Sequence, residues 1–238
     1  MNRLIIDTET AGDVNNKSTL RVYDLGFIII DNEGKRLAER NWVIADVFYG
    51  MGAEMQSAYY ANKLPAYHEE IKQGIREVIT FRDAKAEFAA LCKEFNVKEV
   101  WAYNAQFDRS ALNTTLRVLS NGFASYFIPY GIKWCCIHHA AVECICNKRK
   151  FYRWALSHGF VSKAGKVRTS AECVYAYLTD NPSYVEEHTA YQDALIETEI
   201  LLKVLKQRKK LHKEPIFNAW IKPQKGFKEF METQKKSL

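Results

Sequence analysis

Apolar and polar positions along the first part of the chain follow the pattern of β-strands. The runs "RLIID", "YDLGFIIID" and "RNWVIAD", at residues 3–7, 23–31 and 40–46, are rich in β-branched and aromatic residues, which is typical of strands. The segment "DNEGK" at residues 31–35 separates the last two runs and favours a hairpin turn. The pattern therefore predicts three consecutive strands of one sheet.

The rest of the chain changes to helical spacing of apolar residues, interrupted by short apolar runs. Helices are predicted over residues 65–75, 81–95, 107–119, 135–146, 170–178 and 191–210. Short strands are predicted over residues 98–104 and 131–136. Strands that come first and then alternate with helices indicate a mixed sheet with helices packed on it.

Composition adds that the chain is an ordinary globular protein. It has 238 residues, of which 47% are hydrophobic and 26% charged, and this length suits one domain or one domain with an appendage. No apolar run approaches the roughly 20 residues that span a bilayer. The amino-terminal residues lack the basic and apolar regions of a signal peptide. We therefore expect a cytoplasmic protein without a membrane segment.

The net charge of +6 is concentrated at the carboxyl end. Residues 203–238 contain 11 Lys or Arg and 3 Asp or Glu, whereas the other 202 residues contain 23 basic and 25 acidic groups. A basic tail favours nucleic acid or another polyanion, although basic residues also suit a solvated helix end. The tail aromatics, Phe217, Trp220, Phe227 and Phe230, would either stack on bases of a single strand or pack on the body.

Six cysteines raise the question of a zinc site. The segment "CCIHHAAVECIC" at residues 135–146 mixes cysteine with His138 and His139 but contains no C-x-x-C pair. Adjacent residues on a helix point in different directions, so we favour a buried helix over a zinc site.

The first strand carries a pair of acids at its end. Asp7 and Glu9 are two residues apart, so their side chains project to the same side of the strand. Burial and mutual repulsion make two such carboxylates costly to ionise, and a divalent cation would offset that cost. A solvent-exposed strand end is the alternative, as in the similar pair Asp31 and Glu33 of the hairpin turn.

Two further sites carry residues of the same chemistry. Asp108 falls in the first turn of a helix that follows a strand, where it would also favour the helix dipole. His188 and Asp193 are five residues apart, a spacing that does not share one face of a regular helix. The two side chains converge if His188 lies in the loop before the helix and Asp193 in its first turns. A capping or surface histidine is the alternative.

Taken in order, three motifs resemble the DEDDh branch of the DnaQ-like 3′–5′ exonucleases. They are "DTET" at residues 7–10, "NAQFD" at 104–108 and "HTAYQDA" at 188–194. The sister branch has Tyr four residues before the last Asp, where this chain has Thr189. The resemblance covers about residues 1–208, the exonuclease domain it implies, and leaves residues 209–238 as a tail. The implied fold is ribonuclease-H-like: an α/β protein with a mixed five-stranded sheet and helices on both faces.

The resemblance also implies a catalytic site with two Mg²⁺ or Mn²⁺ ions. The implied metal ligands and catalytic acids are four carboxylates, Asp7, Glu9, Asp108 and Asp193. Asp7 would bridge the two ions, and His188 would be the general base for the attacking water. Within the matching motifs, the residues expected to bind substrate are Thr8, Thr10 and Asn104.

The substrate expected from this resemblance is a single-stranded 3′ end, hydrolysed to nucleoside 5′-monophosphates. We favour DNA, and an exoribonuclease of the oligoribonuclease or ribonuclease T kind is the nearest alternative. A protein partner such as a polymerase would bind through the tail. A binding protein on the same scaffold is the alternative from another class, but such proteins are expected to lose one or more of the acids, and all are present here.

Overall fold

The computed structural model describes residues 1–13, 15–56, 58, 60–207, 211 and 221–235. Its centre is one six-stranded mixed sheet with the strand order β4-β3-β2-β1-β5-β6. The strands are β1 (Asn2–Ala11), β2 (Arg21–Ile30), β3 (Arg36–Ile44), β4 (Glu77–Ile79), β5 (Val97–Ala102) and β6 (Lys133–Cys136). Strands β1, β2 and β3 pair antiparallel, while β5 pairs parallel to β1, β6 to β5, and β4 to β3.

The expected five-stranded sheet is corrected to six strands. The additional strand, β4, has three residues and pairs at the outer edge of β3. Only the register from Trp42 to Ile44 holds it, and Val78 within it is 38% exposed. So short and exposed an edge strand has no alternating apolar pattern, which is why the sequence did not indicate it.

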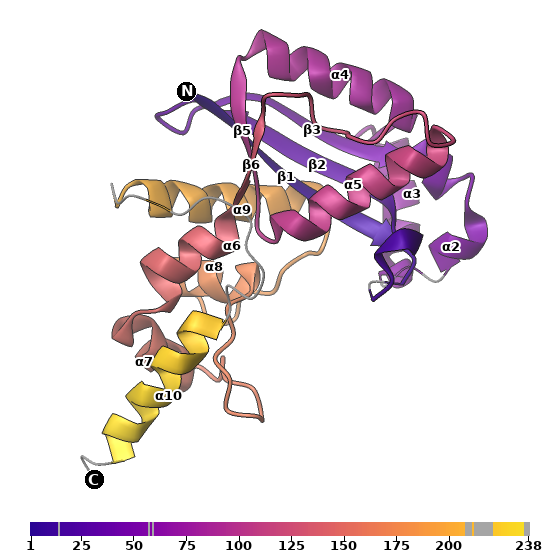
Figure 1. The fold of residues 1–238 in the computed structure, drawn as a ribbon. Helices are drawn as coiled ribbons and strands as arrows, with labels where there is room; N and C mark the ends of the chain where they lie inside the picture. The colour runs from indigo at the N-terminus through magenta and orange to yellow at the C-terminus, as the bar shows by residue number, and fades with distance from the viewer. Residues whose placement is uncertain (14, 57, 59, 208–210, 212–220, 236–238) are drawn as a thin grey trace.

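Helices cover both faces of the sheet (Figure 1). The first face packs against α1 (Ala45–Phe48), α2 (Gly52–Gln56), α3 (Leu64–Lys72), α4 (Phe81–Glu94) and α5 (Ala105–Leu119). On the second side, α6 (Ile137–Ala141) and α9 (Ala190–Leu205) lie against the sheet. The π-helical turn η3 (Val142–Cys146), α7 (Arg149–Ser157), α8 (Ala171–Thr179) and α10 (Ile221–Lys235) pack behind them in the same apolar cluster. Two short 3₁₀ turns, η1 (Lys17–Thr19) and η2 (Ala61–Lys63), lie in connections. The predicted α/β architecture is therefore confirmed.

The alternation of side chains along β1 explains the two cores. Leu4 and Ile6 belong to the cluster under α4 and α5, while Ile5 belongs to the cluster under α9. Because successive residues of a strand face opposite sides, the residues that follow, Asp7 and Thr8, are directed to different faces of the sheet. The alternation along β1 therefore directs Asp7 toward α9 and Thr8 toward α5.

The carboxyl-terminal helix α10 packs onto α7, away from the sheet (Figure 1). Phe227 and Phe230 are 3% and 5% exposed, and their rings lie 5.5 and 5.9 Å from that of Tyr152. Packing of the tail aromatics on the body is thus confirmed for these two, and base stacking by them is wrong. Phe217 and Trp220, as well as residues 208–210 of the long predicted helix, lie outside the described residues.

The cysteines lie in the interior of the protein. All six are buried and none forms a disulfide, and the groups of possible metal ligands found among the described residues contain none of them. The interpretation as a largely buried helical segment is confirmed for residues 137–146, whereas Cys135 and Cys136 belong to the end of β6. The described helices also include none that is long and apolar enough to cross a bilayer.

Candidate active site

Strand β1 brings Asp7 and Glu9 to the face of the sheet that α9 covers. In the register with β2, Asp7 lies opposite Gly26 and Glu9 opposite Asp24. A β-carbon at Gly26 would overlap the backbone nitrogen of Tyr191 in the first turn of α9. The helix therefore begins directly against the backbone of β2, beside Asp7. Glycine inside a strand marks such close approaches, and it is the local reason that Asp193 reaches the acids of β1.

Three carboxylates converge at this point. One oxygen each from Asp7, Glu9 and Asp193 lie within 4.8 Å of one another. The acids come from residues nearly 190 positions apart in the chain, and the approach of α9 to β1 and β2 places them together. The structure thus brings the pair on β1 together with an acid from the late helix.

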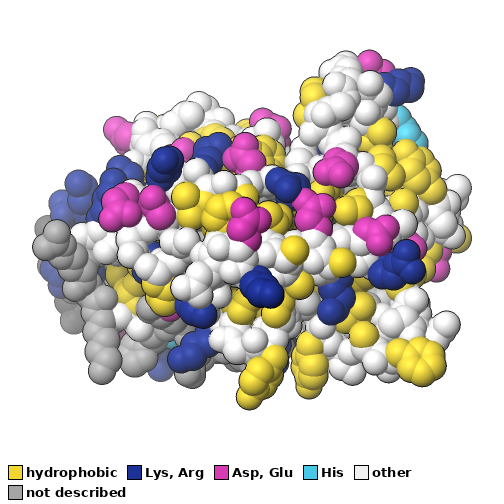
Figure 2. Space-filling view, turned by 90° about the horizontal axis from the view of Figure 1, so that it is seen from above, with side chains coloured by type: hydrophobic (Ala, Val, Ile, Leu, Met, Phe, Trp, Pro, Cys, Tyr) yellow, Lys and Arg dark blue, Asp and Glu magenta, His cyan; other side chains and the backbone are white. Residues whose placement is uncertain are grey.

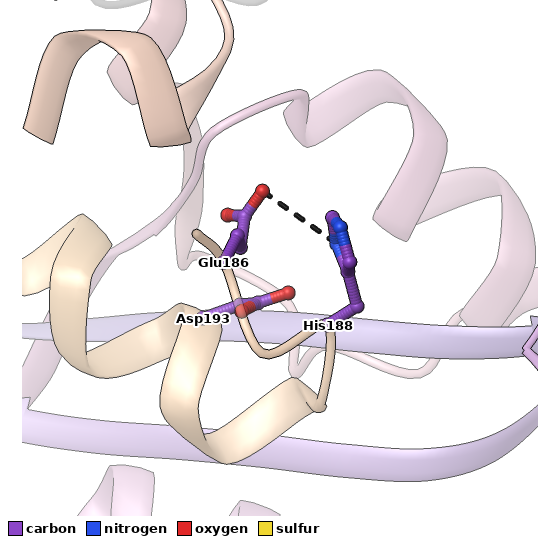
Figure 3. A group of neighbouring side chains, drawn as sticks. All are labelled: Glu186, His188 and Asp193. Atoms are coloured by element: carbon purple, nitrogen blue, oxygen red, sulfur yellow. Dashed lines mark ion pairs between the residues drawn. The ribbon is translucent and has the colours of Figure 1, made fainter. Parts of the chain in front are cut away.

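His188 joins the cluster from the loop before α9, as the spacing required. Its backbone is in the left-handed region, with φ of 50°, and Thr189 takes the N-cap position of the helix. Ligand atoms of Glu186, His188 and Asp193 lie within 4.8 Å of one another, and Nδ1 of His188 is 3.6 Å from a carboxylate oxygen of Glu186 (Figure 3). The left-handed residue reverses the chain so that His188 and Asp193 meet.

The segment from Tyr60 to Lys63, which includes η2, contacts both the ring and the backbone of His188. The imidazole stacks on the ring of Tyr60, with centroids 4.7 Å apart and planes inclined by 14°. Lys63 donates hydrogen bonds to the carbonyl oxygens of Glu187 and His188. Partial burial lowers the pKa of His188, and the positive charge of Lys63 lowers it further. A neutral imidazole that remains 34% exposed can accept a proton from a solvent molecule.

Asp108 approaches from the other face of the sheet. It lies in the first turn of α5, is 2% exposed, and accepts a hydrogen bond of 2.9 Å from the hydroxyl of Thr8. Burial raises its pKa to about 7, although that hydrogen bond opposes the shift. Its negative charge contributes to the raised pKa of Asp7, which places it within electrostatic range of the cluster.

The residues expected to bind substrate differ in accessibility. Thr8 and Thr10 are 4% and 7% exposed, and the Thr8 hydroxyl is used by Asp108. Asn104 is exposed at the N-cap of α5, and its side chain makes no capping hydrogen bond. Of the three side chains, Asn104 is therefore the one placed to meet a ligand.

The electrostatics of the cluster favour a bound cation. Burial raises the pKa of Asp7 well above its ordinary value, and neighbouring carboxylates raise it further. Burial and the charge of the neighbouring acids also raise the pKa of Glu9 to about 9 and that of Asp193 to about 8. One oxygen of Asp193 is buried without a hydrogen-bond partner among the described residues. A hard divalent cation would satisfy that oxygen and offset the repulsion, so the donor set fits Mg²⁺ or Mn²⁺.

Two acids of the site were not predicted from the sequence. Glu197 is 2% exposed, accepts a hydrogen bond of 3.1 Å from the backbone nitrogen of Tyr103, and raises the pKa of Asp7. Glu197 follows Asp193 by four residues, so both lie on the same face of α9. That spacing is the feature of the sequence that could have indicated Glu197. Glu186, whose pKa burial raises to about 7, lies in an irregular loop, and no periodic pattern indicates it.

A buried ion pair holds the start of α9 in place. Asp24 on β2 is fully buried and accepts a hydrogen bond of 3.0 Å from the backbone nitrogen of Ala190, the first residue of α9. The hydroxyl of Tyr67 donates to the same oxygen of Asp24, and the other oxygen is 3.0 Å from the guanidinium of Arg76. Asp24 satisfies an amide that helix termini leave unpaired, while Arg76 compensates its charge.

Solved structures share this fold. E. coli exonuclease I in complex with a dA16 oligonucleotide matches with a TM-score of 0.51 and 14% identity, over 87% of this chain and 41% of that one. A full-length 3′-exonuclease matches with 0.58 and 14%, over 92% and 88%. A 3′-exonuclease described in 3′-end specific recognition of a histone mRNA stem-loop matches with 0.58 and 13%, over 92% and 68%.

The chain thus spans about two fifths of the length of exonuclease I. No protein-family model matches the sequence, and the comparison with curated proteins finds no match. At these identities the likeness establishes the ribonuclease-H-like fold.

Proposed function

We propose that this protein is a metal-dependent 3′–5′ exonuclease of the DEDDh type that hydrolyses single-stranded nucleic acid to nucleoside 5′-monophosphates. The observation that carries the proposal is the convergence of Asp7, Glu9 and Asp193 beside His188, with Asp108 within electrostatic range. Acids from three separate segments, each buried at a cost, meet at one point. The fold shared with solved exonucleases supports the same reading.

The carboxylates of Asp7, Glu9, Asp108 and Asp193 would hold the cations. When bound, a pair of divalent cations stabilises the charge that develops on the attacking and leaving oxygens. The residues of the chain supply the remaining elements of the reaction. Thr8 fixes the carboxyl group of Asp108, and Glu197 is held against the strand backbone, so the acids are oriented before substrate arrives.

His188 is the general base of the proposed reaction. It takes a proton from the attacking water, whose oxygen bonds to phosphorus while the bond from phosphorus to the 3′ oxygen breaks. The leaving 3′ oxygen then receives a proton from solvent. Glu186, 3.6 Å from Nδ1, stabilises the imidazolium that forms, and the lowered pKa of His188 keeps its base form present at neutral pH.

The proposal is tested with oligonucleotides labelled at the 5′ end. DNA and RNA of one sequence are incubated with the protein in Mg²⁺, Mn²⁺ or a chelator, beside the isosteric variant Asp7→Asn. We expect a ladder that shortens from the 3′ end, requires metal and is lost in the variant. The same gel compares the rates for DNA and RNA, and we expect DNA to be hydrolysed faster. A labelled strand that stays intact with both metals would refute the function.

A further inference from the structure

The acidic cluster by itself would repel a polyanionic strand, which makes basic surface near it informative. Three hollows, with volumes of about 510, 450 and 250 Å³, adjoin the segment from 125 to 134. The first two lie along the outer side of α5, and the third lies between that segment, the end of α4 and the start of β5. The first two share Arg109 and Tyr126, and the last two share Pro129 and Tyr130. The hollows therefore follow one another along this side of the molecule, and we call them together the α5 groove.

The charge of the α5 groove is of one sign. Its basic lining residues are Lys17, Lys93, Lys98, Arg109 and Arg117, and its described lining includes no Asp or Glu. The neighbouring surface over α4 differs, because acidic and basic side chains are interspersed there (Figure 2). The groove therefore complements an anionic chain, although residues 1–202 together have more acids than bases.

Solvent-exposed aromatic side chains lie along the same groove. Tyr126 and Tyr130, which line it, have 70% and 106% of their surface exposed, and Phe123 nearby has 95%. Exposed aromatic side chains that gather along a groove, unlike ones scattered singly, mark surfaces that bind a ligand. A groove lined by basic side chains with aromatic rings beside them suits single-stranded nucleic acid. The basic side chains contact the phosphates, and the bases stack on the rings.

The groove passes the first turn of α5, which carries Asp108 of the candidate active site. Arg109 directly follows Asp108 in the first turn of α5, and one helical step of about 100° turns it from the buried side to the surface. Lys17, which lines the first hollow together with Arg109, lies in η1 shortly after β1. A strand whose 3′ end reached the acids would thus meet the first cations of the groove immediately upstream.

We infer that the α5 groove binds the 5′ continuation of the single strand whose 3′ end enters the active site. This inference deepens the proposed function and depends on it. It assigns strand binding to the aromatics of residues 123–130, whereas Phe227 and Phe230 of the tail are buried. It predicts that affinity rises with oligonucleotide length, because a long strand fills the groove and a dinucleotide does not.

Binding is measured by fluorescence anisotropy of a labelled dT15 in chelator, where no hydrolysis occurs. The variant Tyr126→Ala with Tyr130→Ala is compared with Tyr126→Phe with Tyr130→Phe, which keeps both rings. We expect a loss of roughly 5- to 150-fold for each stacked base in the alanine variant and near wild-type affinity in the phenylalanine variant. Equal affinities for the two variants would overturn the assignment of stacking.

Charge is tested with Arg109→Ala plus Arg117→Ala against Arg82→Ala plus Lys163→Ala, a control pair of exposed cations outside the groove. We expect the groove variant to reduce the slope of log K against log[salt] by about 1.4, since each contact to a single strand contributes about 0.7. Equal slopes in the two variants, or binding of polyglutamate as tight as that of dT15, would overturn the groove as a nucleic-acid site.

Hydrolysis separates this inference from the proposed function. In Mn²⁺, the ratio of kcat/KM for dT15 to that for a dinucleotide should fall in the groove variants and stay constant in the control pair. A wild-type protein that cleaves both substrates, with this ratio unaltered in the groove variants, would overturn the groove alone. A wild-type protein that binds dT15 through the groove but cleaves nothing would overturn the function alone.

Discussion

The imidazole of His188 stacks on the ring of Tyr60, with centroids 4.7 Å apart and planes inclined by 14°. Burial beside this ring lowers the pKa of His188, and a general base must be neutral to accept a proton. We expect Tyr60→Ala to expose the imidazole, raise its pKa and move the acid limb of the rate profile to higher pH. Loss of stacking lowers turnover by roughly 2- to 10-fold. Tyr60→Phe keeps the ring and should retain the wild-type profile; an identical profile for Tyr60→Ala would contradict this role.

Substitution of His188 should lower the turnover number much more than it lowers the affinity for Mn²⁺. We expect His188→Ala to lower kcat by roughly 10²–10⁴-fold, the range for loss of a general base. Calorimetric titration with Mn²⁺ should show binding largely kept, because the carboxylates on β1 and α9 remain. Turnover at the wild-type rate would show that His188 is not the base, and loss of Mn²⁺ binding would show that it acts as a ligand.

Gly26 sets the distance between β2 and α9. In Gly26→Ala the new methyl group overlaps the backbone of Tyr191, so α9 must move and carry Asp193 away from Asp7. Overpacking of this kind costs about 1–3 kcal/mol, and we expect Mn²⁺ affinity to fall with it. Gly52→Ala is the matched control, because no atom lies within 4 Å of a β-carbon there. The prediction fails when both variants bind Mn²⁺ like the wild type.

Stability without metal should depend on pH in an unusual direction. The folded pKa values of Glu9 and Asp193, about 9 and 8, lie above the ordinary values of 4.5 and 3.8. The folded state therefore holds protons that the unfolded state has lost, and stability falls as pH rises from about 4 to 9. In chelator, Tm should fall over this range by roughly 2–4 °C for each kcal/mol, and Mn²⁺ should reduce the fall.

Glu197→Gln provides a control on the origin of that effect. The glutamine amide can still accept the hydrogen bond from the backbone nitrogen of Tyr103. The substitution removes one buried carboxylate whose charge raises the pKa of Asp7. The decline of Tm with pH should therefore be shallower in this variant. A Tm independent of pH in chelated wild-type protein would show that the acids are not buried together.

Much of this architecture follows from local patterns. Apolar runs rich in β-branched and aromatic residues predicted the three strands that open the sheet. Helical spacing predicted α4, α5 and α9 because each buries one apolar side. The parity of β1 placed Asp7 and Glu9 on one side, and Asp108 fell where a strand leads into a helix. His188 was expected in a loop because five residues do not share a helical face, and its positive φ bears this out.

Contacts between distant segments were not predictable in the same way. Strand β4 is held by its register with β3 and has no pattern of its own. The ion pair of Asp24 with Arg76 joins residues 52 positions apart, and neither residue stands in a motif. The stacking of Tyr60 on His188 depends on how an irregular segment folds back over the site. Gly26 within β2 and Glu197, one turn after Asp193, are visible in the sequence. Their roles become clear only from the contacts that they make in the folded protein.

The most direct test of the central claim is an anomalous difference map from crystals soaked in Mn²⁺. The account predicts two peaks bounded by the carboxylates of Asp7, Glu9, Asp108 and Asp193, with His188 beside them. Crystals of Asp7→Asn, treated identically, should lose at least one peak. A map without density among these carboxylates, in crystals whose side chains lie as described here, would contradict the account.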